Sequence, residues 1–298
     1  MSNKTIGFIG LGNMGAPMAE NLLKNGYTVY GYDINEEALN TFADKGGNSC
    51  PTVKQAVENA DVLFVSLPSP PIVRDVYLGE DGILAHAPKN LLIADTSTVS
   101  SELNRELGEA CKEKNVRYLG APVSGGVIGA VNATLTFMVG GPKQDYEEVR
   151  PVLDVLGGNL FYLGEGYDSG TVIKLINNLM IGFYTEAVGE ALTLGENMGL
   201  DRQTMYDILN VSYGQSKIYD RNYKEYMANE DYEPGFSTNL LLKDLKLAQQ
   251  MAEESGTQLP IGDKLVDWYS TVADNGYGHN DMSAVYLYLQ KLGQKQKQ

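Results

Sequence analysis

The sequence is poor in the residues from which most metal sites are built. It has two histidines, His86 and His279, and two cysteines, Cys50 and Cys111, among 298 residues. None of these has the spacing of zinc ligands, and two cysteines cannot form the disulfide framework of a small secreted protein. We therefore expect no metal site, no mechanism centred on histidine, and a reducing, cytoplasmic environment.

Positive charge and long apolar runs are scarce as well. The chain carries 23 lysines and arginines against 38 aspartates and glutamates, a formal net charge of −15. Nucleic acids and anionic membranes bind surfaces with a local excess of lysine and arginine, so neither is an expected partner. No apolar run reaches transmembrane length, and the run that starts at Ile6 leads directly into a glycine loop. That segment is expected to be a strand and not the core of a signal peptide.

The first half of the chain alternates short apolar runs with helical patterns. The expected strands are Thr5–Gly10, Tyr27–Asp33, Asp61–Leu67, Leu91–Asp95, Arg117–Ala121, Thr134–Gly140 and Asn159–Leu163. The expected helices between them are Gly15–Asn25, Glu36–Lys45, Val53–Asn59 and Ser100–Lys114. Strands that are apolar on both faces are typical of a parallel sheet covered by helices. The pattern predicts an α/β fold with a Rossmann-like, doubly wound domain over residues 1–165.

Helical periodicity replaces this alternation from Asp168 onward and predicts an all-helical second domain over residues 166–298. A long interdomain helix should run from Asp168 or Ser169 to Gly199. Its first half is apolar nearly all round, which predicts burial between domains or subunits and hence self-association. The later expected helices are Asp201–Val211, Ser216–Met227, Asn239–Ser255, Ile261–Asn275 and Met282–Leu292.

A glycine loop joins the first expected strand to the first expected helix. Its Gly-x-Gly-x-x-Gly spacing allows a tight turn, a close approach of the backbone to a pyrophosphate, and packing of helix on strand. Asp33 ends the next strand, where it would accept hydrogen bonds from the adenosine ribose and repel a 2′-phosphate. The loop and Asp33 make residues 1–165 a dinucleotide-binding domain, with NAD as the expected cofactor and NADP as the less favoured one. The expected cofactor-binding residues of the loop are Gly10, Leu11, Gly12, Asn13, Met14 and Gly15.

Lys174 is the single charged residue in the run from Val172 to Thr185. A cation in so apolar a segment is costly unless something uses or compensates it, because desolvation disfavours the charged form. Asn178 lies four residues further on, so the two side chains share one helix face. This is the geometry of a proton donor beside a group that orients an oxygen. The alternative is a lysine whose side chain extends to solvent.

A second loop, rich in small residues, follows the expected strand Arg117–Ala121. Its backbone N–H groups and the Ser124 hydroxyl could bind a carboxylate. The alternative is a loop whose glycines only supply positive φ angles.

Four motifs in order make the chain similar to the β-hydroxyacid dehydrogenase family over essentially its whole length. They are the cofactor loop Gly10–Gly15, the substrate loop Ala121–Gly126, the catalytic motif Gly170–Asn178 and the cofactor-closing segment Gly235–Leu245. The resemblance implies that Lys174 is the general acid and base and that Asn178 holds the reacting oxygen. It also implies that the substrate carboxylate is bound by Ser124, Gly125 and Gly126. The residues implied to line the nicotinamide are Leu67, Pro68 and Thr98, and Lys243, beside Asp244, is implied to contact the cofactor.

The same resemblance implies a reaction and an assembly, with residues 166–298 as the substrate and dimerisation domain. The reaction is the NAD-dependent interconversion of a small 3-hydroxy acid and its semialdehyde, above all 3-hydroxyisobutyrate, in a homodimer or homotetramer. Lys217 or Arg221 could add a second anionic contact, which leaves tartronate semialdehyde reductase and sulfolactaldehyde reductase as alternatives. A non-catalytic NAD-binding scaffold is an alternative of another class.

Overall fold

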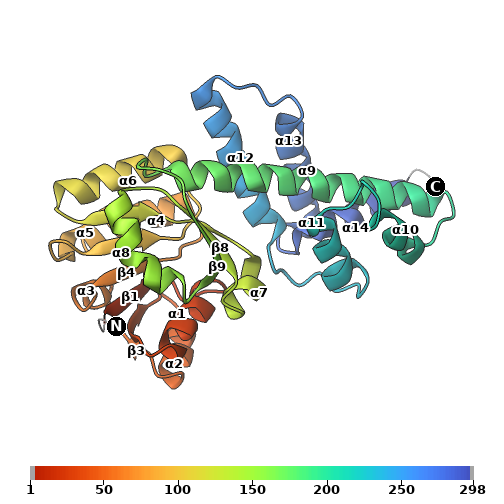
Figure 1. Ribbon diagram of the computed structural model, residues 1–298. Helices are drawn as coiled ribbons and strands as arrows, with labels where there is room; N and C mark the ends of the chain where they lie inside the picture. The colour runs from red at the N-terminus through yellow and green to blue at the C-terminus, as the bar shows by residue number, and fades with distance from the viewer. Residues whose placement is uncertain (1–3, 296–298) are drawn as a thin grey trace. The chain divides into compact units, whose positions relative to one another are not determined.

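The computed structural model describes residues 4–295 and divides into two compact units. The first unit ends at Lys174 and the second begins at Leu175. This division falls inside the helix α9, Ser169–Asn197 (Figure 1). Of the described helices, none is long and apolar enough to cross a membrane.

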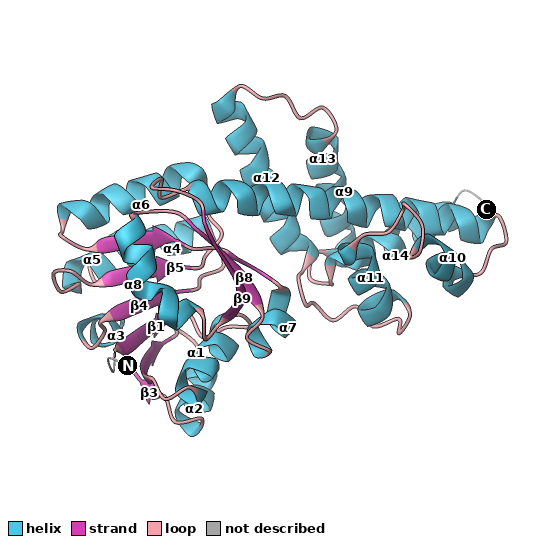
Figure 2. Ribbon diagram, in the orientation of Figure 1, coloured by secondary structure: helices cyan, strands magenta, loops and turns pink. Residues whose placement is uncertain are grey.

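A six-stranded parallel sheet forms the centre of the first unit (Figure 2). In spatial order it consists of β3 Asn48–Ser49, β2 Thr28–Tyr32, β1 Thr5–Ile9, β4 Val62–Val65, β5 Leu92–Asp95 and β6 Arg117–Gly120. The order reverses between β1 and β4, and in such sheets ligands bind outside the carboxyl ends of the strands at this point. The predicted α/β fold with a doubly wound sheet is confirmed.

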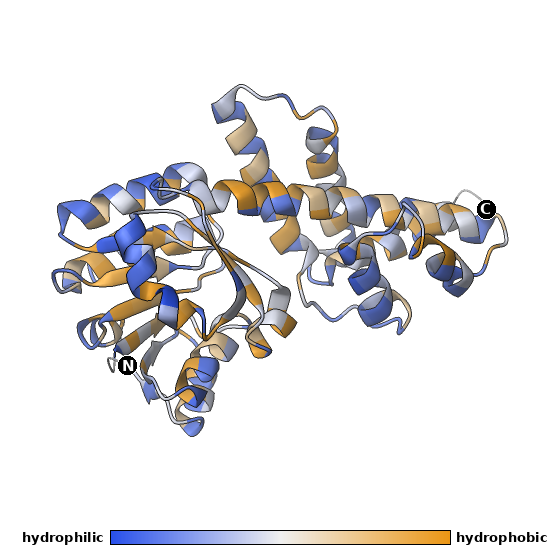
Figure 3. Cartoon of the chain, viewed as in Figure 1, coloured by the Kyte–Doolittle hydropathy of each residue, from blue (hydrophilic) through white to orange (hydrophobic). Residues whose placement is uncertain are grey.

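Both faces of the sheet are buried, which explains why its strands lack an alternation of apolar and polar residues. Phe64 of β4 is buried on one face together with Phe8 of β1, and their rings stack with centroids 5.8 Å apart. The neighbouring residues Leu63 and Val65 belong to the core on the other face. Figure 3 shows the apolar residues concentrated in these strands and in the first half of α9.

Eight helices accompany the strands of the first unit in the described residues. Those that the sequence predicts are α1 Gly15–Lys24, α2 Glu36–Asp44, α3 Val53–Glu58 and α6 Ser101–Glu113. The others are α4 Pro70–Leu78, α5 Ile83–His86, α7 Gly126–Val131 and α8 Lys143–Leu153. α4 is hard to predict because it begins with two prolines. Proline is nonetheless tolerated in the first helical turn, where its missing N–H has no intrahelical acceptor.

A second, small sheet carries the loop that contains Ser124. Its strands are β7 Val123–Ser124, β8 Leu135–Val139 and β9 Gly157–Tyr162, with β7 antiparallel and β9 parallel to β8. The two strand-like runs predicted after the Ser124 loop are β8 and β9. The two-residue strand β7 has no periodicity by which a sequence could indicate it.

In its described residues the second unit consists of helices joined by loops, as the sequence predicts. Besides the end of α9 it contains α10 Arg202–Leu209, α11 Lys217–Arg221, α12 Thr238–Ser255, α13 Gly262–Val272 and α14 Val285–Lys295. A short 3-10 helix, η3 Met282–Ala284, precedes α14. The predicted helices Ser216–Met227 and Ile261–Asn275 each change into a wider π-helical turn, η1 Asn222–Met227 and η2 Ala273–Tyr277. Such turns are rare and often mark functional segments.

Candidate active site

The glycine loop lies at the carboxyl end of β1, and its three glycines have different reasons to be glycine. Gly10 has a φ of +93°, and a Cβ there would lie 2.2 Å from the Ser66 carbonyl oxygen. A Cβ on Gly15 would lie 1.8 Å from the Gly10 carbonyl oxygen. A Cβ on Gly12 would meet no atom within 4 Å. The first and third glycines are thus required by the loop's own packing, whereas Gly12 leaves its backbone open to a ligand.

The Asp33 carboxylate is hydrogen-bonded to this loop. Its Oδ2 accepts a hydrogen bond from the Leu11 N–H at 2.6 Å, and its Oδ1 accepts one from the Asn35 N–H at 2.8 Å. A carboxylate can accept about four hydrogen bonds, so both oxygens keep capacity for a ribose diol. The loop and the carboxylate therefore fit the phosphate and ribose of a dinucleotide. Asn13 is exposed and Met14 half-buried on the same loop.

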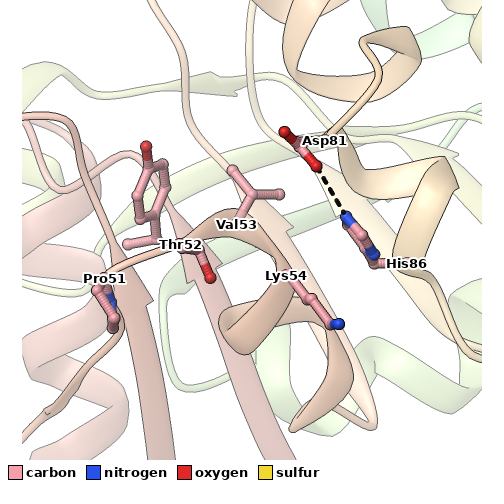
Figure 4. Close-up of a pocket in the computed structure, with 7 residues that line it drawn as sticks. Pro51, Thr52, Val53, Lys54, Asp81 and His86 are labelled. Atoms are coloured by element: carbon pink, nitrogen blue, oxygen red, sulfur yellow. Dashed lines mark ion pairs between the residues drawn. The ribbon is translucent and has the colours of Figure 1, made fainter.

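A cavity of about 310 Å³ adjoins Tyr32, the last residue of β2. Its lining residues are Tyr32, Pro51, Thr52, Val53, Lys54, Asp81 and His86. Figure 4 shows the Asp81 and His86 side chains paired on one side of this cavity, with Asp81 Oδ1 3.7 Å from His86 Nε2. Apart from the scarcity of histidine, no signal in the sequence draws attention to these residues, because they come from three separate parts of the chain: the end of β2, the segment that leads into α3, and the segment that contains α5.

The loops after β4 and β5 are joined to each other by side-chain hydrogen bonds. The Leu67 N–H donates to Ser97 Oγ at 3.0 Å, and both the N–H and the hydroxyl of Thr96 donate to the Val65 carbonyl at 2.8 Å. Leu67 and Thr98 are half-buried and Pro68 is exposed at this edge of the sheet. These three residues, which the resemblance assigns to the nicotinamide, thus lie on loops that follow adjacent strands.

The Ser124 loop presents open backbone. Gly125 and Gly126 have φ angles of +132° and +63°, both are exposed, and a Cβ on Gly126 would meet no atom within 4 Å. Ser124 is half-buried at the end of β7. Positive φ angles turn successive N–H groups toward one side, an arrangement that binds anions. A carboxylate is an anion that this loop can accept.

Lys174 belongs to the same compact unit as the two loops, and its side chain is buried at 9% exposure. The turn of α9 that precedes it touches the ends of the strands: a Cβ on Gly170 would lie 2.0 Å from the Met138 carbonyl oxygen and 3.0 Å from that of Gly120. Gly120 is the last residue of β6, directly before the Ser124 loop. Gly170 therefore allows the helix that carries Lys174 to begin at this edge of the sheet. The alternative of a lysine extended into solvent is wrong.

Asn178, one helical turn after Lys174, is held by α12 within the second unit. Its Nδ2 donates to Asp244 Oδ2 at 2.5 Å, and its Oδ1 accepts from Asn177 Nδ2 at 3.0 Å. Lys243 Nζ lies 2.9 Å from Asp244 Oδ1, which compensates the charge of this buried carboxylate. The amide orientation of Asn178 is therefore fixed, and one of its N–H groups is left for a ligand oxygen.

Arg221 has a structural role in the second unit. Its two terminal nitrogens bind the two oxygens of buried Asp281 at 2.7 Å each, and its Cζ lies 4.1 Å from the centre of the Tyr226 ring. Lys217, the other cation considered for a second anionic contact, is exposed. Among the described residues no group of histidine, cysteine, aspartate and glutamate side chains could hold a metal ion.

Two family profiles together match nearly the whole chain. Residues 5–164 match the profile described as the NAD binding domain of 6-phosphogluconate dehydrogenase. Residues 168–289 match the profile described as the NAD-binding domain of NADP-dependent 3-hydroxyisobutyrate dehydrogenase.

Curated proteins similar to the chain are named dehydrogenases. The mitochondrial 3-hydroxyisobutyrate dehydrogenase of Drosophila melanogaster is 38% identical, covering 97% of this chain and 90% of that protein. The 2-(hydroxymethyl)glutarate dehydrogenase of Eubacterium barkeri is 36% identical and covers 94% and 93%. The NAD-dependent L-serine dehydrogenase of Pseudomonas aeruginosa is 36% identical and covers 95% and 96%. A solved structure, Mycobacterium tuberculosis 3-hydroxyisobutyrate dehydrogenase with L-serine, is 36% identical with a TM-score of 0.88, covering 96% and 99%.

Proposed function

The chain belongs to the β-hydroxyacid dehydrogenase family and is an oxidoreductase with nicotinamide-dinucleotide-binding domains, and on that premise we propose that it interconverts a small 3-hydroxy acid and its semialdehyde. 3-Hydroxyisobutyrate is the substrate we favour. The observation that carries the proposal is the buried ammonium of Lys174 in the unit that also holds the glycine loop and the Ser124 loop. An enzyme that moves a hydride and a proton together needs these three parts.

In this mechanism each part of the chain has one task. The bound cofactor would supply or accept the hydride. Ser124 and the N–H groups of Gly125 and Gly126 bind the substrate carboxylate and fix its orientation. Lys174 donates a proton to the aldehyde oxygen during reduction and removes it from the hydroxyl during oxidation. Asn178, oriented by Asp244, donates a hydrogen bond to the same oxygen.

The alternatives receive no specific support from the site. The two terminal nitrogens of Arg221 form a bidentate ion pair with Asp281 and also donate to Asn222 and Tyr226, so they are not available to a second anionic group of tartronate semialdehyde or a sulfonate. A non-catalytic scaffold would not need a buried lysine on α9. Two relatives, named for L-serine and for 2-(hydroxymethyl)glutarate, suggest that the pocket of this family accepts other hydroxy acids.

A kinetic screen tests the proposal. Purified protein is supplied with NAD or NADP and with 3-hydroxyisobutyrate, glycerate, serine, 3-hydroxypropionate, sulfolactate and 2-(hydroxymethyl)glutarate, and the absorbance of the reduced nicotinamide is followed. We expect the highest kcat/KM for 3-hydroxyisobutyrate with NAD. Binding of NADH without turnover on any of these acids would favour the scaffold.

We further propose that NAD is preferred over NADP because of Asp33, and that the adenine end of the cofactor uses the cavity beside Tyr32. Asp33→Asn keeps the size of the side chain but removes its charge. We expect this change to raise the ratio of kcat/KM with NADPH to that with NADH by about tenfold, since a carboxylate repels a 2′-phosphate. Lys54→Ala, which changes a cation lining the same cavity, is the control. A larger effect of Lys54→Ala than of Asp33→Asn would assign cofactor choice to the cavity.

Self-association is part of the proposal. Ile176, Met180 and Tyr184 are 40%, 47% and 44% exposed and recur every four residues on α9, so they form an apolar stripe on one helix face. We expect this stripe to be covered in a homodimer or homotetramer, and light scattering of the purified protein should give a dimeric or tetrameric mass. A monomer at micromolar concentration would contradict it.

The free, buried cysteines Cys50 and Cys111 support a reducing compartment, and we propose the cytoplasm.

A further inference from the structure

Besides Lys174, the first unit buries a carboxylate that has no part in the mechanism above. Asp95, the last residue of β5, is 0% exposed. Burial raises its pKa to about 6, although the hydrogen bonds from Ser97 and Tyr118 act in the opposite direction. The titratable groups that face it are Tyr77 from α4, Tyr118 from β6 and Cys111 from α6, and none of these is a cation. A buried carboxylate without a cationic partner is costly to fold, so its contacts are informative.

One oxygen of Asp95 is connected to the start of α9 by three buried side chains. Tyr118 OH lies 3.4 Å from Asp95 Oδ2, and Asn104 Nδ2 donates to Tyr118 OH at 2.8 Å. Thr171 Oγ1 in turn donates to Asn104 Oδ1 at 2.5 Å. Every donor in this series points toward the carboxylate, so the hydrogen bonds polarise one another. Thr171, Asn104 and Tyr118 are at most 1% exposed.

The other oxygen of Asp95 holds the loop after β5. Its Oδ1 accepts from the Ser97 N–H at 2.9 Å, and Ser97 Oγ accepts from the Leu67 N–H at 3.0 Å. Thr98 follows directly in this loop. One oxygen of Asp95 is therefore linked through Ser97 to the loops assigned to the nicotinamide. The other is linked through Tyr118, Asn104 and Thr171 to the helix that carries Lys174.

We propose that Asp95 is a positioning residue, which through Tyr118, Asn104 and Thr171 holds the first turn of α9 in register with the loop that carries Thr98. This inference rests on the proposed function, because its purpose is to place Lys174 relative to the loop that carries Thr98. The series, which we call the Asp95 relay, is formed by residues from β5, β6, α6 and α9 and lies entirely within the first unit.

Thr171→Val tests the relay at its helical end, because valine keeps the shape of threonine and lacks the hydroxyl. We expect kcat to fall by about three- to tenfold, since a small misplacement of a catalytic group is enough to slow the reaction. The dissociation constant of NADH should stay within about twofold, because the glycine loop is not part of the relay. Thr171→Ser restores the hydroxyl and should restore most of kcat.

Thr185→Val is the matched control. Thr185 lies on the same helix, is also 0% exposed, and also bonds an asparagine amide, Asn222 Nδ2, at 3.2 Å, but it has no link to Asp95. We expect it to lower the melting temperature as Thr171→Val does and to leave kcat nearly unchanged. Equal losses of kcat in the two variants would overturn the proposal, because burial alone would then explain them.

Tyr118→Phe interrupts the relay at a distance from α9 and keeps the ring, which packs edge-on against Tyr77 and Tyr167. In the cofactor-free protein we expect faster amide hydrogen exchange in peptides that cover residues 170–178, whereas Thr185→Val should not change exchange there. Unchanged exchange in Tyr118→Phe would overturn the relay whatever the substrate is. Faster exchange in a protein that oxidises none of the acids would keep the relay and reject the proposed function.

A double variant gives a further check. Because Thr171 and Tyr118 belong to one series, the loss of kcat in Thr171→Val/Tyr118→Phe should not exceed that of the more severe single variant. Additive losses would mean that the two hydroxyls act independently, and the proposed relay would be wrong.

Discussion

Lys174→Ala is expected to lower turnover by about two to four orders of magnitude, the usual contribution of a general acid or base. The side chain is buried, and it belongs to the unit that also holds the cofactor and carboxylate loops. Removing it takes away the proton donor for the reacting oxygen, whereas the glycine loop and Asp33 stay intact. The dissociation constant of NADH, measured by fluorescence titration, should therefore remain within about threefold of the original value.

Two further variants separate the loss of the ammonium from other effects. Lys174→Met keeps an unbranched side chain of similar length, so it should be as inactive as Lys174→Ala without leaving a cavity. Lys246→Ala removes an exposed lysine from α12 and should leave turnover unchanged. Near-normal kcat in Lys174→Met would show that the ammonium is not the acid and would require another proton donor.

Gly12→Ala should weaken NADH binding by about 10- to 100-fold while the protein remains as stable as before. A Cβ at this position meets no atom of the protein within 4 Å, so the fold tolerates it. The methyl group would instead occupy the space through which the backbone approaches a pyrophosphate, and overpacking of this kind costs about 1–3 kcal/mol. Calorimetric titration with NADH and a thermal melt of the free protein measure the two quantities separately.

Gly15→Ala and Gly158→Ala are two controls for this prediction, one expected to destabilise the protein and one expected to be neutral. A Cβ on Gly15 would lie 1.8 Å from the Gly10 carbonyl oxygen, so this change should destabilise the loop and lower the melting temperature. A Cβ on Gly158 has its nearest contact at 3.7 Å, far from the loop in sequence, and should change neither quantity. If Gly12→Ala bound NADH normally, the glycine loop would be a turn without a ligand.

The parts of the protein that the sequence determines are those in which the signal is local. Apolar runs on both faces of Ile6–Ile9 and Val62–Val65 require a sheet covered by helices, and the spacing of Gly10, Gly12 and Gly15 requires a tight turn between strand and helix. Lys174 is conspicuous because a lone charge in an apolar helix is costly wherever that helix packs. Each of these conclusions depends on residues that are neighbours in the chain.

The partners of the buried polar groups were decided only by the tertiary structure. Asn178 and Asp244 are 66 positions apart, Arg221 and Asp281 are 60 apart, and Thr171 and Asn104 are 67 apart. A hydrogen bond between such residues has no periodicity in the sequence, because it depends on how separate elements pack. For this reason the sequence offered Arg221 as a substrate contact, whereas the fold commits it to Asp281. The Asp95 relay is not recognisable in the sequence either. Only packing shows that these polar side chains are shielded from solvent and must find hydrogen-bond partners inside the protein.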